Sequence, residues 1–409
     1  MTAVRTSPAT DPAPLPLIGP YVPWLPVPDL PEPAAAQGLS GARIAVKDVI
    51  DFAGTPTGNG HPLLLAEAVP ATRHADCLGR LIAAGAVPAG KAHTDELAYS
   101  LGGTNAHYGA PANPAAPGHL CGGSSSGTAA AVAGRLADIG LGTDTAGSIR
   151  VPASYCGLYG LRPSHARADL TGISPLAPSF DTPGLLTRSL PLLRDAAAAL
   201  LAGTEADDRA PLRVLAPADL WSLATGPVRA ALAPALDRLA EGLGLPLDRS
   251  PLFDDLAPVQ HTGARDAFKT VQAAEVWRVH GPWVTRARPA FGPNVTERLR
   301  IAAVVDGARE EAARARVAAV ARWLGRRLDG AVLAIPATPT PAPAHACASS
   351  ADRDALLALT CLAGLGGLPA LTVPGPRAEG LPVGLCLLTV PGGDEQLVSA
   401  GMSMEPGRA

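Results

Sequence analysis

The sequence is poor in aromatic side chains, in blocks of like charge and in long uninterrupted apolar runs. Phe, Tyr and Trp make up 4% of the 409 residues, so a core has to be built mainly from Ala, Leu and Val. The formal net charge is −3 and no basic block occurs, which argues against nucleic acid as a partner. The longest apolar stretch, 356–373, is interrupted by Gly364, Gly366 and Pro369. We interpret it as a buried helix followed by a strand, and we expect no membrane span.

Cysteine is scarce as well. The six cysteines show no Cys-x-x-Cys motif and no paired spacing, and the N-terminal residues lack the charged-then-apolar pattern of a secretory signal. Reduced thiols and a cytoplasmic location are therefore expected. His345 and Cys347 lie close together in the sequence, but no second pair of potential metal ligands accompanies them. The sequence therefore predicts no metal site.

Apolar residues are abundant and periodic. Hydrophobic residues make up 47% of the chain and charged residues 17%, which allows a large buried core. Residues 1–38 are rich in Pro and Ala, and we expect them to lie on the surface, ahead of one domain that spans 39–409. Alternating strand-like and helix-like segments predict an α/β layer fold. The expected strands include 42–50, 86–91, 139–141, 331–335, 370–373 and 382–387, and the expected helices include 72–84, 128–137 and 264–283.

The arginine-rich stretch 309–327 is interpreted as an amphipathic helix rather than as a nucleic-acid-binding segment. Apolar residues recur there at helical spacing, namely Val317, Val320, Ala321, Leu324 and Leu328. The arginines then form the solvated face of that helix, which is the commoner arrangement.

The most informative stretch, 121–163, combines two loops of small residues with apolar segments. The first loop, 122–127, reads Gly-Gly-Ser-Ser-Ser-Gly, and the second, 142–148, reads Gly-Thr-Asp-Thr-Ala-Gly-Ser. An Ala-rich run that predicts a closely packed helix, and a short strand, separate them. Two such loops bring hydroxyl and backbone N–H groups to one spot, and acyl transfer needs a nucleophilic oxygen beside fixed oxyanion donors.

Two other interpretations of these loops fit the sequence less well. Gly/Ser runs are often flexible linkers, but a linker does not lie between apolar, periodic segments. A Gly-rich loop ahead of a helix can also hold phosphate. The stretch lacks both the lysine of a GxxxxGK[ST] loop and the GxGxxG spacing.

The same stretch resembles the signature of the amidase signature family of serine hydrolases. The similarity includes GGSS, the Ala-rich run, GTD, SIRVPA and CGLYGLRP, as well as the 24-residue spacing between Ser124 and Ser148. Ser126 and Ala146 stand where the family usually has Gly, and Ala146 is expected to narrow the second loop slightly. Ser126 and the segments around 280–283 and 291–293 are similar to the plant indole-3-acetamide hydrolase branch. The resemblance covers roughly 40–400 and implies a single α/β/α domain around a large mixed central sheet.

Lys47 is the one lysine in the apolar run 42–50. A lysine in such a run is often only a charge on an edge strand. The resemblance implies another role, because the segment is similar to the family's (V/I)KD motif, whose lysine is the catalytic base. A base has to be neutral, and burial among Ile44, Val46 and Val49 would lower the pKa of Lys47 from its free value.

The resemblance also implies roles for the loop residues. Ser148 is the expected nucleophile, and Ser124, after a cis peptide bond with Gly123, is expected to relay protons between Ser148 and Lys47. The expected oxyanion hole consists of the backbone N–H groups of Thr145, Ala146, Gly147 and Ser148. Thr94 and Ser125 are expected on the substrate side of the network. We expect Asp144 to hold the second loop in place and His107 to be structural, because no carboxylate partner for a Ser-His-Asp triad stands out.

The expected function is hydrolysis of a small carboxamide to a carboxylate and ammonia through an acyl-enzyme, without metal or cofactor. The plant-branch similarity points to an aryl- or indole-acetamide. Two alternatives remain open, namely a glutamine amidase subunit of a tRNA-dependent amidotransferase and an inactive binding protein on the same fold. The plant-branch segments argue against the first, and the presence of Lys47, Ser124 and Ser148 argues against the second. The expected partner is a small-molecule amide substrate. The oligomeric state that we consider for the protein is a homodimer.

Overall fold

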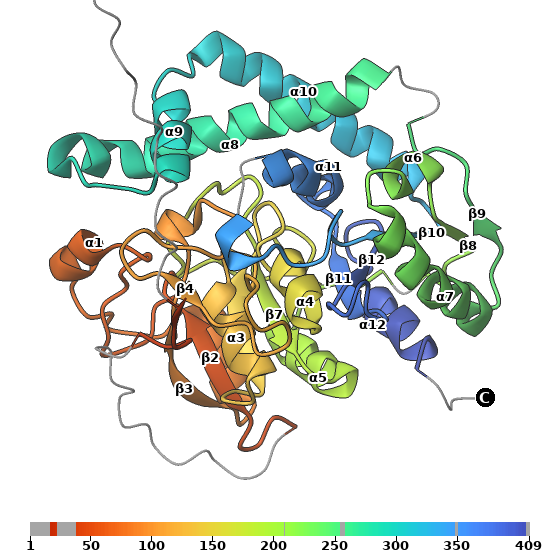
Figure 1. Ribbon diagram of the computed structural model, residues 1–409, viewed down its shortest axis with the longest axis horizontal. Coiled ribbons are helices and arrows are strands. Elements are labelled where there is room, and N and C mark those ends of the chain that lie inside the picture. Colours follow the sequence, from red (N-terminus) through yellow and green to blue (C-terminus); the bar gives the residue numbers. More distant parts are fainter. Residues whose placement is uncertain (1–16, 23–37, 208, 254–257, 348–350, 406–409) are drawn as a thin grey trace, which may run out of the picture.

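A computed structural model describes residues 17–22, 38–207, 209–253, 258–347 and 351–405. Within these ranges the main element is a ten-stranded mixed sheet with helices packed on both of its faces (Figure 1). The predicted α/β layer fold with a large mixed central sheet is therefore confirmed.

The sheet runs in the order β3-β2-β5-β7-β6-β11-β12-β10-β8-β9. Its strands are β2 (Arg43–Lys47), β3 (Val87–Ala92), β5 (Ile139–Thr143), β6 (Tyr159–Arg162), β7 (Pro183–Thr187), β8 (Arg213–Leu215), β9 (Leu247–Asp248), β10 (Ala331–Pro336), β11 (Ala370–Pro374) and β12 (Gly384–Leu388). A separate pair joins β1 (Leu17–Ile18) and β4 (Ala110–Pro111). Because β2 pairs in parallel with both β3 and β5, the C-terminal ends of β2 and β5 lie side by side. This register brings Lys47 next to Thr143.

Helices connect and cover the strands. They are α1 (Pro62–Glu67), α2 (Asp76–Ala83), α3 (Ser126–Ala133), α4 (Arg150–Cys156), α5 (Leu190–Leu200), α6 (Ala218–Trp221), α7 (Gly226–Leu243), α8 (Pro258–Ala287), α9 (Pro293–Ala302), α10 (Gly307–Arg327), α11 (Ala351–Gly366) and α12 (Asp394–Ser403). Short 3-10 turns lie at Glu96–Ala98 and His345–Cys347. No described helix has both the length and the apolar character needed to cross a membrane.

The two faces of the sheet belong to different apolar clusters, as alternation along a strand requires. On β10, Val332 and Ala334 pack into the cluster that includes α2, α5, α7 and α12. Leu333 and Ile335 of the same strand pack on the other face, into the cluster formed by α8, α10 and α11. Figure 1 shows α8 and α10 as a long antiparallel pair above that face. The site described below lies on the α11 side of this arrangement.

The Ala-rich run after the first loop forms α3, two residues earlier than expected and ending at Ala133. Its small side chains let it lie close to the sheet, and Ala129 and Ala131 belong to the same buried cluster as Ala45 of β2. A β-carbon on Gly140 of β5 would come within 3.2 Å of Val132. This close approach fixes the start of α3, and with it the first serine loop, over the ends of β2 and β5.

Most other predicted elements are present with shifted ends. The segment expected as a strand over 42–50 ends at Lys47, because the N–H groups of Val49 and Ile50 both turn back to the Lys47 carbonyl (2.8 and 3.0 Å). The apolar stretch 356–373 divides into α11 and β11, as predicted. The stretch 309–327 forms α10, with Leu324 buried and its arginines mostly exposed or half-buried.

Candidate active site

Lys47 is the last residue of β2, and its side chain is fully buried. Its Nζ atom lies 2.7 Å from Ser124 Oγ and 2.8 Å from Thr143 Oγ1. Thr143 is the last residue of β5, which pairs in parallel with β2. The register of this pair therefore places Thr143 beside Lys47. The structure therefore joins Lys47 directly to the first serine loop.

The environment of Lys47 favours its neutral form. Burial lowers the pKa of Lys47 from 10.5 to about 7, although the carboxylates of Asp95, Asp144 and Asp181 pull in the opposite direction. Desolvation penalises an ammonium group that has no carboxylate in direct contact. A lysine with a pKa near 7 is partly neutral at neutral pH, which is the state that a proton acceptor needs.

The first serine loop is held by backbone contacts from several directions. The Gly123–Ser124 peptide bond is cis. The Gly123 N–H donates to the Leu101 carbonyl (2.9 Å), and the Ser125 N–H donates to the Ser148 carbonyl (3.3 Å). The second of these contacts ties the two loops together. The hydroxyls of Ser124 and Ser148 make no hydrogen bond with each other in this structure, so Ser148 is linked to the Lys47–Ser124 pair through the backbone.

Thr94 lies beside this loop and Ser125 belongs to it, and both residues are buried. The Thr94 hydroxyl donates to the Ser124 carbonyl (2.9 Å), and the Ser125 hydroxyl donates to the Thr143 carbonyl (3.3 Å). In this structure both side chains therefore support the loop. Contact of either one with a substrate stays a prediction.

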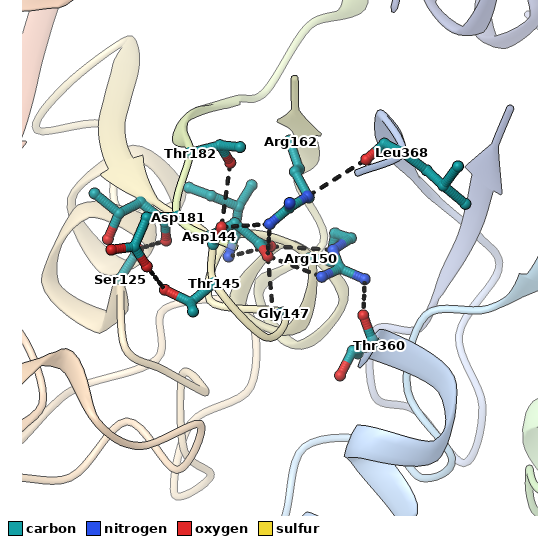
Figure 2. Close-up of polar contacts among 12 residues, drawn as sticks. Ser125, Asp144, Thr145, Gly147, Arg150, Arg162, Asp181, Thr182, Thr360 and Leu368 are labelled. Atoms are coloured by element: carbon teal, nitrogen blue, oxygen red, sulfur yellow. Dashed lines mark hydrogen bonds and ion pairs between the residues drawn. The ribbon is translucent and has the colours of Figure 1, made fainter. Parts of the chain in front are cut away.

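The second loop is organised around the carboxylate of Asp144. That carboxylate accepts hydrogen bonds from the Gly147 N–H (2.9 Å) and the Ile149 N–H (3.1 Å). It is also ion-paired with the fully buried guanidinium of Arg150 at 2.8 Å and with that of Arg162 at 3.2 Å. Figure 2 shows Asp144 at the centre of these contacts. This agrees with the interpretation that Asp144 holds the loop and is not a base.

The two neighbouring guanidinium groups keep the Asp144 carboxylate ionised. Burial alone would raise the pKa of Asp144, but the adjacent guanidiniums of Arg150 and Arg162 hold it well below its usual range. Arg150 also donates to the Thr360 carbonyl of α11 (2.7 Å), and Arg162 donates to the Asp144 carbonyl (2.5 Å). The loop is therefore anchored to the sheet and to α11 at once.

A second carboxylate supports the same loop from the other side. Asp181 accepts the Thr145 hydroxyl at 2.5 Å and the backbone N–H groups of Leu176 and Ala177 at 2.8 and 2.9 Å. Figure 2 shows Asp181 and Arg162 approaching the loop from different directions. The segment between Asp144 and Ser148 is therefore fixed at both of its ends.

The backbone N–H groups of this loop are not equivalent. The Gly147 N–H is used by Asp144. Within the described part of the chain, the N–H groups of Thr145, Ala146 and Ser148 have no hydrogen-bond acceptor. Of the four donors expected in the oxyanion hole, three are therefore available, whereas Gly147 is already engaged because its N–H closes the Asp144 turn.

The two departures from the usual glycines fit without backbone strain. Ala146 is absent from the residues with positive φ, so this position does not require Gly. Gly147 does require it, because its φ is +124° and a β-carbon there would lie 2.9 Å from Thr360 Cβ. Ser126 begins α3, and its hydroxyl lies 3.5 Å from the Asp95 carboxylate.

His107 belongs to a different contact. Its Nε2 atom lies 2.9 Å from the Ala290 carbonyl and 3.7 Å from Glu96, and its ring packs against that of His61. These contacts join the segment after the 3-10 turn at Glu96–Ala98 to the connection between α8 and α9. They support the structural interpretation of His107.

Three residues of the site were not anticipated from the sequence. Thr143, Arg162 and Asp181 reach the loops through sheet pairing or from segments 18 to 36 residues away. The sequence does show Thr143 at the end of a short apolar segment and Arg162 within another apolar segment. The sequence shows no register, and hence no way to know that their side chains meet.

Comparisons with known proteins add independent information. The Amidase family model matches residues 31–222. Amidase 1 of Arabidopsis thaliana is 33% identical over 397 residues, covering 90% of this chain and 93% of that protein. The range matched by the family model includes both serine loops and Lys47.

Two further similarities bear on the site and the fold. Indoleacetamide hydrolase of Pseudomonas syringae pv. syringae is 39% identical over 213 residues, covering 50% of this chain and 47% of that protein. A crystal structure of an amidase superposes with a TM-score of 0.78 at 29% identity, covering 90% of this chain and 85% of that one.

Proposed function

The chain belongs to the amidase signature family of amide-hydrolysing enzymes, and we propose that it cleaves a small carboxamide to a carboxylate and ammonia through Lys47, Ser124 and Ser148. The observation that carries this proposal is the buried contact of 2.7 Å between Lys47 Nζ and Ser124 Oγ. It pairs a lysine that is partly neutral at pH 7 with a hydroxyl in the loop bonded to the Ser148 backbone.

The first half of the reaction acylates Ser148. Its Oγ attacks the amide carbon while its proton passes to Ser124 Oγ and the Ser124 proton passes to Lys47 Nζ. The C–N bond then breaks, and the proton held by Lys47 returns through Ser124 to the departing nitrogen, which leaves as ammonia. The protons balance in this half of the reaction, because Lys47 is neutral both before the attack and after ammonia leaves.

The second half regenerates the enzyme. A water molecule attacks the acyl carbon, and its proton follows the same route through Ser124 to Lys47. When the ester bond breaks, that proton returns to Ser148 Oγ and the product leaves as a carboxylic acid, which loses its remaining proton to solvent to give the carboxylate. One relay therefore serves both halves of the reaction.

The negative oxygen formed at each attack needs fixed donors. We assign that role to the N–H groups of Thr145, Ala146 and Ser148, which have no acceptor within the described residues. Asp144 and Asp181 hold the loop rigid, so these donors need little reorganisation when charge develops.

The substrate side of the proposal is an aryl- or indole-acetamide. It is supported by the similarity to indoleacetamide hydrolase, which covers half of this chain. Thr94 and Ser125 lie beside the Ser124 carbonyl and the end of β5, and we propose that they shape the wall of the substrate site as well as supporting the loop.

Ammonia release by the purified full-length chain tests the proposal. The panel comprises indole-3-acetamide, phenylacetamide, an aliphatic amide series and glutamine, with the Ser148→Ala variant as the matched blank. We expect turnover of arylacetamides above that of glutamine, and none with the variant. Hydrolysis of glutamine alone would support the amidotransferase alternative, and equal turnover by Ser148→Ala would exclude Ser148 as the nucleophile.

A further inference from the structure

His280, on α8, is a buried histidine with one ring nitrogen unused. Its side chain is largely enclosed, with 7% of the residue exposed, and one ring nitrogen donates a hydrogen bond to the backbone carbonyl of Pro175. The other nitrogen, Nε2, is buried and has no hydrogen-bond partner among the residues that the structure describes. The nitrogen that contacts Pro175 is therefore Nδ1.

The contact with Pro175 decides which nitrogen of His280 carries the hydrogen. A backbone carbonyl can only accept a hydrogen bond, so Nδ1 is the protonated nitrogen. Burial lowers the pKa of His280 to about 4, so the ring is neutral at neutral pH. Nε2 of the neutral ring therefore carries a lone pair, and His280 presents a buried hydrogen-bond acceptor.

His280 lies on the face of α8 that packs toward the serine loops. Val276, one turn before it, and Trp283, one turn after it, belong to one buried cluster with Leu97 and Leu176. Residues three or four positions apart share a helix face, so the His280 side chain points toward this same cluster. It therefore stands between α8 and the two segments that carry Leu97 and Leu176.

Both of these segments are bonded to the serine loops. In the first segment the Thr94 hydroxyl donates to the Ser124 carbonyl at 2.9 Å. In the second, the Leu176 N–H donates at 2.8 Å to the Asp181 carboxylate, which also accepts the Thr145 hydroxyl at 2.5 Å (Figure 2). The unused acceptor therefore lies on the α8 side of the chain segments that hold both loops.

The first segment has an unusual backbone conformation. Leu97 and Ala98 both have positive φ, at 54° and 55°, a region that non-glycine residues rarely adopt. Such conformations persist where the surrounding structure imposes them, and they concentrate at catalytic and ligand-binding sites. Here the conformation accompanies burial of the Leu97 side chain in the apolar cluster beside His280.

A ligand is the group best suited to use this nitrogen. Leaving a buried acceptor without a donor is costly, and native proteins rarely do so. A metal ion would need further ligands, and the described residues contain no group of three or more His, Cys, Asp or Glu side chains that could hold one. A neutral imidazole acceptor in an apolar cluster instead suits a neutral N–H group on a flat apolar ring.

We propose that His280 Nε2 accepts a hydrogen bond from an N–H group in the ring of the substrate, and that this contact selects an indole ring over a phenyl ring. The amide group lies at Ser148, and the ring lies against the cluster that contains Leu97, Leu176 and Trp283. This inference rests on the proposed function for the position of the amide. It deepens that proposal by naming the residue that distinguishes indole-3-acetamide from other arylacetamides.

Two substrates that differ in one ring atom test the contact. Benzofuran-3-acetamide has nearly the shape of indole-3-acetamide, but an oxygen replaces the ring N–H. We expect kcat/KM of the full-length protein to be about tenfold or more higher for indole-3-acetamide, because the benzofuran oxygen leaves the buried acceptor unpaired. Methylation of the indole nitrogen, which removes the same N–H, should lower kcat/KM at least as much.

Variants at position 280 then assign this preference to the histidine. His280→Phe keeps a ring but has no acceptor, so the ratio of kcat/KM for the indole and benzofuran amides should fall to within about twofold of one. His280→Gln offers an amide oxygen in place of Nε2 and should retain part of the preference. A purely structural role of His280 would lower both rates equally and leave the ratio unchanged.

His165→Phe is the matched control. The ring of His165 also contacts a proline carbonyl, that of Pro178 at 2.9 Å, three residues after the proline that holds His280. Its Nε2 is used in that contact, so it offers no unused buried acceptor. His165→Phe should therefore keep the full preference for indole-3-acetamide.

Binding measurements separate this inference from the proposed function. Calorimetry on Ser148→Ala compares the indole and benzofuran amides, and then repeats the comparison with His280→Phe added. Tighter binding of indole-3-acetamide, lost with the second substitution, supports the contact even if no amide is hydrolysed.

NMR of Ser148→Ala labelled at the histidine nitrogens leaves His280 itself unchanged. Indole-3-acetamide should shift the His280 Nε2 signal, and benzofuran-3-acetamide should not, because only the first donates a hydrogen bond to that nitrogen. Equal binding of the two amides, an unchanged ratio in His280→Phe, or an Nε2 signal that does not move would overturn the inference while leaving amide hydrolysis intact.

Discussion

Replacing Lys47 by methionine should abolish amide hydrolysis and yet make the protein more stable. Lys47 is fully buried, and burial lowers its pKa from 10.5 to about 7. Between those two values the unfolded chain holds a proton that the folded chain has released. The stability of the wild type therefore rises with pH across this window, and the penalty is largest below about pH 7.

The size of the effect follows from the shift. At about 1.36 kcal/mol per pKa unit, the penalty is about 4 kcal/mol at pH 7 and about 1 kcal/mol at pH 9.5. Methionine removes this penalty but loses the hydrogen bonds to Ser124 and Thr143, at about 1 kcal/mol each. Lys47→Met should then be more stable by about 2 kcal/mol at pH 7. Between pH 7 and pH 9.5 the stability of Lys47→Met relative to the wild type should fall by about 3 kcal/mol. The lost hydrogen bonds contribute equally at both pH values and therefore cancel from this difference.

Urea unfolding of the wild type and Lys47→Met at both pH values measures this difference, with ammonia release measured alongside. The matched control is Lys91→Met, because Lys91 is also buried but lies 3.3 Å from the Asp48 carboxylate. That substitution strands a buried charge and should destabilise the fold by about 3 kcal/mol. A Lys47→Met variant that is less stable at pH 7 and equally so at pH 9.5 would refute the reasoning, since it would mean that Lys47 is charged and well paired.

Three further outcomes are expected. A fluorophosphonate should label one residue, which peptide mapping should identify as Ser148. Ser148→Ala should remove the label, and Ser124→Ala should only slow the labelling reaction. An adduct on Ser124, Ser125 or Ser126 would contradict the proposed roles. Gly147→Ala should lower kcat/KM by about 100-fold, because its β-carbon would lie 2.9 Å from Thr360 in a φ region unfavourable to alanine, while Gly79→Ala, with open space around it, should not. Dialysis against a strong chelator should leave turnover unchanged, and a loss restored by zinc would count against a mechanism carried by Lys47, Ser124 and Ser148 alone.

The sequence was sufficient for the fold class and for the elements around the loops. The Ala-rich run, the short strand after it and the lysine in an apolar segment are local patterns, and each predicts its element from its own neighbours. They correspond to α3, β5 and β2, with ends shifted by a few residues. The shifts arise at turns such as that after Lys47, where backbone hydrogen bonds rather than side-chain periodicity end the strand.

The support of the second loop could not be predicted, because it depends on register and on long-range packing. Asp144 meets Arg162 only when β6 and β5 take their places on either side of β7. Asp181 meets Thr145 across the turn that precedes β7. The occupation of the Gly147 N–H by Asp144 follows from a tight turn, which residue types alone do not specify.

The buried carboxylates of Asp144 and Asp95 differ in pKa, and this difference explains why low pH should abolish activity without unfolding the Ser148 loop. Asp144 keeps its charge in acid, because Arg150 and Arg162 hold its pKa well below the usual range against the effect of burial. Asp95 differs, since burial raises its pKa to about 6, close to the value of about 7 for Lys47. As the pH falls, Asp95 gains a proton and stops favouring the charged form of Lys47. The two titrations therefore oppose each other, and the acidic decline of activity should be broader than a one-proton curve while the Ser148 loop stays in place.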